Sequence, residues 1–159
     1  MGATTFRTIA TGRTAEDAYN RACEQAEFEY GHDPYNGTIS TTSGFVSIPK
    51  PPRCPATKLA SWVFAAQDAH QYDRDIEYFS SNENDLTPWE RRELKEARSN
   101  VKAAWKKVPE QHRELAVRFC TKIDKFGPAG CIEVTGKEAK SVQRRRGEKV
   151  FLFFGWAAM

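Results

Sequence analysis

The chain has 159 residues, of which 40% are hydrophobic and 28% are charged. These values are typical of a folded globular protein, and they exclude a mostly disordered chain. The net charge of +3 at pH 7 is too small for the overall field to identify an anionic partner. We therefore expect a single α+β domain over residues 1–159, in which residues 56–126 could form a helical insertion.

The most apolar stretch, Val150–Met159, is far shorter than the roughly 20 residues that a membrane-spanning helix needs. The first ten residues lack the continuous apolar segment of a secretory signal. The four cysteines show none of the paired spacings that are typical of zinc sites or disulfide scaffolds. They are Cys23, Cys54, Cys120 and Cys131. We expect a cytoplasmic protein with buried, reduced thiols, no membrane contact, no bound metal and no cofactor.

The chain opens with a predicted strand and a predicted helix. The strand covers Thr4–Thr11, where Phe6 and Ile9 are set among polar residues. Thr14 begins a Thr-Ala-Glu-Asp sequence, which is similar to a capping box and favours a helix start. The helix then carries an apolar stripe of Ala18, Ala22, Cys23, Ala26 and Tyr30. Gly31 is expected to end it.

Two short strands, Thr38–Thr42 and Phe45–Ile48, are predicted next, with a hairpin turn at Ser43-Gly44. The proline-rich segment Pro49–Pro55 that follows should run extended, because proline cannot donate to a ladder. A 3.6-residue apolar rhythm then predicts a helix through residues 59–79.

Thr87-Pro88-Trp89-Glu90 is a capping box that predicts a further helix. Pro109 either begins a new helix or kinks this one, and Phe126-Gly127-Pro128 is expected to end the helical middle. Cys131–Val134 and Lys149–Trp156 are the last predicted strands, and the second is apolar on both faces, which indicates a central strand. We expect a mixed or antiparallel sheet of about five strands, packed against three to four helices, in the order β-α-β-β, helical middle, β-β.

The turn-rich segment between the first helix and the next strand is a candidate binding loop. It combines Gly, Pro and Asn residues with side chains that can donate or accept hydrogen bonds. The candidate ligand-binding residues are Tyr30, His32, Asp33, Tyr35, Asn36 and Thr38. The alternative is that Gly and Asn serve only the backbone path, and that Tyr35 covers the core.

The same region carries a family resemblance. Thr14-Ala15, Ala18, Tyr30-Gly31 and Tyr35–Ile39 resemble features of small uncharacterised accessory proteins of actinobacterial phages, which have a Tyr-x-Gly-x-x-x-Tyr-x-Gly-Thr-Ile loop. Phe126–Ala129 is similar to a late motif of that group. Where such proteins often continue with Ala-Glu-Lys, this chain has Ser-Thr-Thr. The resemblance implies a phage product acting in the cytoplasm of a bacterial host, and it implies no activity.

A second candidate site is the basic segment Lys137–Lys149, which holds six basic and two acidic side chains, a local net charge of +4. Such a loop between two strands could neutralise phosphates of a nucleic acid. The candidate nucleic-acid-binding residues are Lys140, Arg144, Arg145, Arg146 and Lys149. The alternative is a solvated loop without a partner.

No nucleophile elbow, phosphate-binding loop or dinucleotide-binding motif is present, so no catalytic residue is assigned. The leading hypothesis is a non-enzymatic phage accessory protein that binds a host protein or small ligand, and so modulates host metabolism or defence. The alternatives are a nucleic-acid-binding accessory protein and a small nucleotide-acting enzyme with His32 as general base, assisted by Asp33 or Tyr35. The apolar last strand also predicts self-association into a homo-oligomer.

Overall fold

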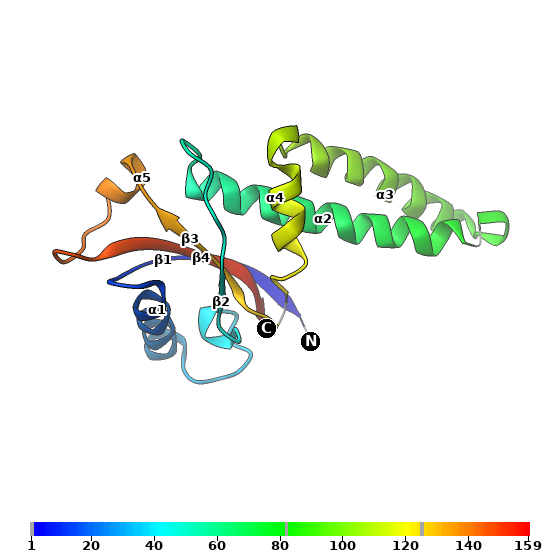
Figure 1. The fold of residues 1–159 in the computed structure, drawn as a ribbon. Helices are drawn as coiled ribbons and strands as arrows, with labels where there is room; N and C mark the ends of the chain where they lie inside the picture. Colours follow the sequence, from blue (N-terminus) through cyan, green and yellow to red (C-terminus); the bar gives the residue numbers. More distant parts are fainter. Residues whose placement is uncertain (1, 82, 125) are drawn as a thin grey trace. The chain divides into compact units, whose positions relative to one another are not determined.

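The computed structural model describes residues 2–81, 83–124 and 126–159, and the chain divides into two compact units (Figure 1). The sheet unit comprises Met1–Ala60 and Thr121–Met159, and the helical unit comprises Ser61–Cys120. Within the described residues, no helix combines the length and the apolar character that crossing a membrane requires.

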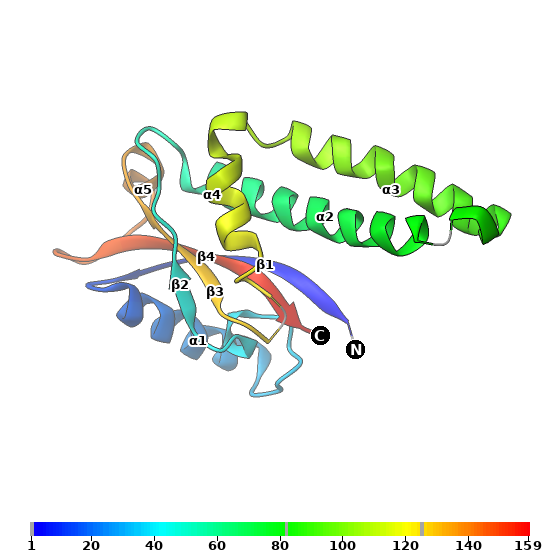
Figure 2. The same cartoon turned by 45° about the vertical axis from the view of Figure 1, so that its right-hand side comes forward.

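The sheet unit is built on four strands in the order β1-β4-β3-β2 (Figure 2). β1 (Ala3–Gly12) and β3 (Ala129–Val134) both pair antiparallel with β4 (Lys149–Ala158), and β2 (Phe45–Ser47) pairs parallel with β3. The predicted α+β class and mixed sheet are confirmed, with four strands rather than about five. β4 lies inside the sheet and Val150–Phe154 is buried throughout, as its two apolar faces predict.

The predicted strand–helix opening is confirmed. Thr14 caps α1 (Ala15–Tyr30), because its side chain accepts a hydrogen bond from the Asp17 N–H at 3.1 Å. The helix ends where the Gly31 N–H bonds the Glu27 carbonyl, with Gly31 at a φ of 83° that favours glycine. β1 and α1 approach closely at Gly12, where an added Cβ would lie 2.6 Å from the Ala18 nitrogen.

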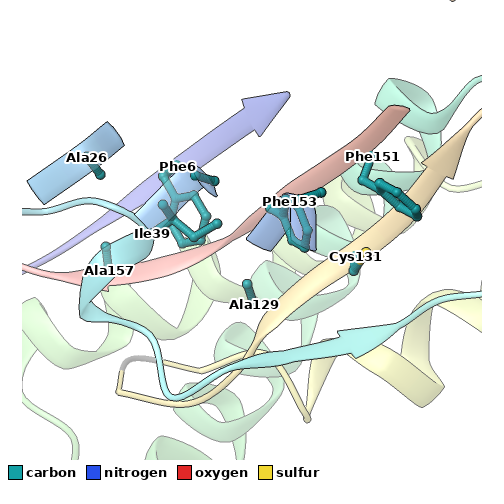
Figure 3. Packing of buried hydrophobic residues seen from close by; sticks show 10 residues of the cluster. Phe6, Ala26, Ile39, Ala129, Cys131, Phe151, Phe153 and Ala157 are labelled. Carbon is teal, nitrogen blue, oxygen red and sulfur yellow. The ribbon is translucent and has the colours of Figure 1, made fainter. Parts of the chain in front are cut away.

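The core of the sheet unit lies between α1 and one face of the sheet (Figure 3). Phe6, Phe151 and Phe153 project from this face, and Ile39 closes the same cluster. Tyr19 of the helix is partly buried and packs against this cluster beside Phe153. The fully buried side chains that the helix contributes are small, and these let the helix backbone come close to the sheet. They are Ala18, Ala22 and Ala26.

The prediction of a strand at Thr38–Thr42 was wrong, because Ile39–Thr41 forms a short 3₁₀ helix, η1. The Thr41 hydroxyl donates to the Thr38 carbonyl at 2.9 Å, and the Thr42 hydroxyl donates to the Ile39 carbonyl at 2.7 Å. Such local side-chain bonds compete with a strand ladder. The predicted Ser43-Gly44 hairpin is therefore absent as well, and β2 pairs with the distant β3 instead.

The helical unit contains most of α2 (Ala56–Ser80), the 3₁₀ turn η2 (Glu83–Asp85), α3 (Pro88–Lys106) and α4 (Glu110–Cys120). The predicted capping box is confirmed, since Thr87 and Glu90 bond each other's backbone N–H groups. Pro109 separates two helices, which settles the alternative left open by the sequence. The predicted end near Phe126 was wrong, because α4 ends at Cys120. With the four-residue α5 (Lys137–Lys140), the described chain has five helices rather than three to four.

Candidate functional site

A groove with a cavity volume of about 640 Å³ lies between β1 and α1. Its floor is apolar and is formed by Phe6, Ala22, Ala26 and Ile39. β1 is one of the two edge strands of the sheet, and among the described strands it pairs only with β4. In an antiparallel pair, alternate residues of an edge strand direct their N–H and C=O groups away from the neighbour. The groove therefore combines an apolar floor with a strand edge that pairs with no described strand.

The rim of the groove is polar. Arg21, Gln25 and Glu29 follow one another at four-residue intervals along α1, so they lie on the same side of the helix. Tyr30, the last residue of the helix, completes the rim together with Asn36 and Thr38 from the loop that follows. An apolar lining with a few polar groups at its edge is the usual composition of a binding pocket.

Asn36 holds the loop that closes one end of the groove. Its Nδ2 donates to the Gly31 carbonyl and to the Ser40 hydroxyl, each at 3.0 Å. Its Oδ1 accepts bonds from the Thr38 N–H at 3.1 Å and from the Thr38 hydroxyl at 2.7 Å. Asn36 and Thr38 thus form a fixed wall, and their hydrogen-bonding capacity is largely used inside the loop.

The structure brings three of the six predicted loop residues to the groove, namely Tyr30, Asn36 and Thr38. The other three do not line it. The side chain of His32 is 84% exposed, and its Nδ1 lies 3.3 Å from Glu27 Oε2. Asp33 Oδ1 accepts a hydrogen bond from the Tyr35 N–H at 2.9 Å. The Tyr35 ring packs edge-to-face on Phe126, with the two ring centroids 6.1 Å apart. The geometry therefore gives no support to His32 as a general base assisted by Asp33 or Tyr35.

Sequence reasoning missed the largest part of the groove, which is the β1 edge and the polar stripe on α1. The spacing of Arg21, Gln25 and Glu29 is visible in the sequence. It is also the spacing of any solvated helix face, and only the position of α1 beside an edge strand distinguishes this stripe from such a face.

A second surface lies at the end of the sheet where β4 begins. Two hollows of about 690 and 710 Å³ adjoin this point. Arg21, Arg144 and Arg145 line the first, and Arg13, Lys50 and Lys149 line the second. Together with the neighbouring Lys140 and Arg146, we name these eight residues the basic end. The five predicted residues of the loop are thus joined by Arg13, Arg21 and Lys50, which sequence reasoning missed because they come from distant segments.

A tight turn before β4 presents the arginines of the basic end. The Glu148 N–H bonds the Arg145 carbonyl at 3.1 Å, and Gly147 has the φ of 83° that a type II turn requires at its third position. Glu148 Oε2 accepts the Arg145 N–H at 3.2 Å, and Glu148 Oε1 accepts Arg21 Nη1 at 2.6 Å. The bond from Arg21 is the largest cause that lowers the pKa of Glu148. The turn is therefore held by hydrogen bonds on both sides.

The cysteines are thiols rather than disulfides, and Cys54, Cys120 and Cys131 are buried. Burial raises the pKa of Cys131 to about 12 and also raises the pKa of the half-buried Cys23. Thiols of this kind are poor nucleophiles at neutral pH. Within the described part of the chain, no three His, Cys, Asp or Glu side chains are placed to hold a metal ion.

The groove beside β1 and the basic end are the two surfaces of the sheet unit from which a function can be inferred. No protein-family model, curated protein or solved structure matches the chain.

Proposed function

We propose that this chain is a binding protein, and that the groove beside β1 takes an extended segment of a partner protein as an added strand. The observation that carries the proposal is the β1 edge. Proteins usually protect a sheet edge with short strands, prolines, several charges or a covering segment. β1 is ten residues long, contains no proline and has Arg7 as its single charged residue. An added strand would satisfy the backbone groups that point away from β4.

The shape of the groove favours an extended segment over a compact small ligand. Phe6–Thr11 line it along the strand, which corresponds to about 20 Å at roughly 3.3 Å per residue. A segment of about six residues would span that length. Alternate side chains of the segment would point towards the apolar floor, and a strand beside β1 would also cover Ile9, which is 45% exposed.

The origin of the partner is inferred from the sequence resemblance. Residues 6–39 carry most of the likeness to phage accessory proteins, and they include β1, α1 and the loop that together build the groove. We therefore propose that the partner is a protein of a bacterial host, and that occupation of the groove modulates the activity of that protein.

The test begins with a displayed library of random heptapeptides selected on the full-length protein. Selected peptides should shift the amide resonances of β1 and of Ala22, Gln25 and Ala26 on α1. Arg7→Pro and Thr8→Pro then serve as a matched pair, since neighbouring residues of β1 direct their N–H groups to opposite sides. One variant should lose stability, and the other should keep its melting temperature and lose peptide binding.

Three results would overturn the proposal. The library could yield no binding peptide, or the selected peptides could shift residues outside the groove. Light scattering could also show a homodimer whose β1 amides are protected from exchange without peptide, because the edge would then already be occupied by a second copy.

A further inference from the structure

We propose that the basic end is a second binding surface, which shares only Arg21 of its eight residues with the groove, and that it holds the phosphate backbone of a nucleic-acid duplex. Its side chains come from segments that the sheet brings together. Arg13 follows β1, Lys50 follows β2, and the turn with Arg144–Arg146 precedes β4 (Figures 1 and 2). The pairing of Gly12 with Lys149 places the end of β1 beside the start of β4.

The acidic groups at this end of the sheet are largely engaged by internal partners. Glu148 is bound by Arg21, and Glu133 Oε1 lies 3.3 Å from Lys149 Nζ. Glu138 accepts hydrogen bonds from the Ala56 N–H at 2.6 Å and from the Thr57 hydroxyl at 3.0 Å. Each of these carboxylates is thus held in place by a bond within the sheet unit.

The remaining carboxylates near the basic end lie on α1. Glu16 and Asp17 are in its first turn, and Asp17 and Glu24 are close enough to Arg21 to raise the pKa of its guanidinium further. Four basic side chains, in contrast, form no ion pair with any residue that the structure describes. They are Arg13, Lys50, Lys140 and Arg146. The end of the sheet therefore carries a cationic excess, which a polyanion would neutralise.

Hydrogen bonds within the chain fix the backbone of the turn and the guanidinium of Arg144 before any partner arrives. Arg146 occupies the second position of the turn, where its side chain is exposed at the tip. Arg144 donates from Nη1 to the Ala139 carbonyl at 2.6 Å, so one nitrogen orients its guanidinium while the others remain available. Guanidinium groups suit phosphate, because they offer several donors in one plane. A prepared set of this kind loses less conformational freedom on binding.

The surroundings of the cations favour a duplex backbone over other polyanions. Single-strand binders stack bases on exposed aromatic rings, and membrane-surface binders insert exposed apolar side chains. Within the described residues, the large exposed hydrophobic side chains all lie outside the basic end. They are Ile9, Phe28, Tyr30, Tyr35, Tyr78, Trp89, Phe126 and Met159. The second hollow is also lined by Ile48 and Phe151, but both are buried. The basic end thus offers contacts to phosphates and no large exposed apolar side chain of the kind that the alternatives require.

The test is fluorescence anisotropy of the full-length protein with a labelled 20-base-pair DNA duplex of mixed sequence, measured over a range of salt concentrations. The logarithm of the affinity should fall linearly with the logarithm of the salt concentration. Arg145→Gln/Arg146→Gln should weaken binding at least tenfold at low salt. The same double substitution should make the slope of this line shallower by about two. The control Arg92→Gln/Lys102→Gln removes the same charge from exposed positions on α3 and should leave binding nearly unchanged. Arg13→Gln alone, in a separate segment, should reduce the slope by about one.

Four results would overturn the inference. The duplex could fail to bind at low salt, or the α3 control could lose as much affinity as the Arg145/Arg146 variant. A single strand of the same sequence could bind as tightly as the duplex. Vesicles with anionic lipids could bind in place of the duplex, with the same dependence on Arg145 and Arg146. None of these results bears on peptide binding in the groove, since the variants leave β1 unchanged.

Discussion

Arg21 on α1 donates a hydrogen bond from Nη1 to Glu148 Oε1 at 2.6 Å, although 127 positions separate the two residues in the sequence. The same nitrogen donates to the Thr11 carbonyl at 3.1 Å. One side chain therefore joins α1, the end of β1 and the turn before β4. It also lines both the groove beside β1 and the first hollow of the basic end.

This bond predicts a pH-dependent contribution to stability. Arg21 lowers the pKa of Glu148 from its ordinary value of 4.5, so the folded state binds this proton less readily than the unfolded chain. The contribution is present above pH 4.5 and is lost as the pH falls through the lowered pKa. Wild-type protein should therefore melt at a higher temperature than Glu148→Gln at about pH 7, and this gap should close by about pH 3.

Arg21→Ala provides the control, because it removes the same bond from the other side. In that background, Glu148→Gln should change the melting temperature much less at about pH 7. A gap between wild type and Glu148→Gln that stays constant from about pH 7 to about pH 3 would contradict this account.

Glu138 is expected to stabilise the start of α2 from a distance. Its carboxylate accepts the N–H groups of Ala56 and Thr57 at 2.6 and 3.3 Å, which places it where an N-cap residue usually acts. Glu138→Ala should lower the free energy of unfolding by about 1–2 kcal/mol, measured by urea denaturation. Lys137→Ala, in the same short helix, should change it by less than about 0.5 kcal/mol. Equal effects of the two substitutions would show that the capping bonds contribute nothing.

Gly130 of β3 lies directly against the side chains of Ile123 and Phe154. An added Cβ would lie 2.6 Å from Ile123 Cδ1 and 2.7 Å from the Phe154 ring. Gly130→Ala should therefore destabilise the protein by about 1–3 kcal/mol through overpacking. Ile123→Val removes the Cδ1 atom and should cost about 0.5–1.5 kcal/mol alone. The double variant should lose less than the sum of the two, and strict additivity in urea denaturation would argue against the contact.

The thiols should differ in reactivity according to burial. Cys131 is 3% exposed, and burial raises the pKa of its thiol to about 12, so the reactive thiolate is scarce at pH 8. Cys23 is half-buried and should react first. Labelling with iodoacetamide at about pH 8, followed by peptide mass spectrometry, should modify Cys23 long before Cys131, and all four cysteines in denaturant. Equal rates at Cys23 and Cys131 in the folded protein would contradict the buried position of β3.

The elements that the sequence predicted well are those with local signals. Thr14 and Gly31 mark the two ends of α1, and the capping box of Thr87 and Glu90 marks the start of α3. These signals are readable because caps act within a single turn. The partners of the strands were not predictable in this way. β2 pairs with β3, although the whole helical unit separates these strands in the sequence, and the start of α2 is capped by Glu138. Both features therefore depend on contacts between segments that are distant in the sequence.

The candidate sites show the same division. The predicted loop supplies Tyr30, Asn36 and Thr38 to the groove, although Asn36 mainly stabilises the loop itself. The edge position of β1 had no local signal, since it depends on which strands pair. The cationic loop before β4 was visible as a charge run, whereas the addition of Arg13 and Lys50 depends on the order of the strands.

Hydrogen exchange of the β1 amides, measured by NMR with and without a selected heptapeptide, tests the strand-addition proposal most directly. In the free protein, alternate amides from Phe6 to Thr11 should exchange rapidly, because their N–H groups face away from β4. Saturation with the peptide should slow those amides at least tenfold and leave the intervening ones unchanged. Uniform protection of β1 without peptide, or peptide binding that leaves the fast amides unprotected, would contradict strand addition in the groove.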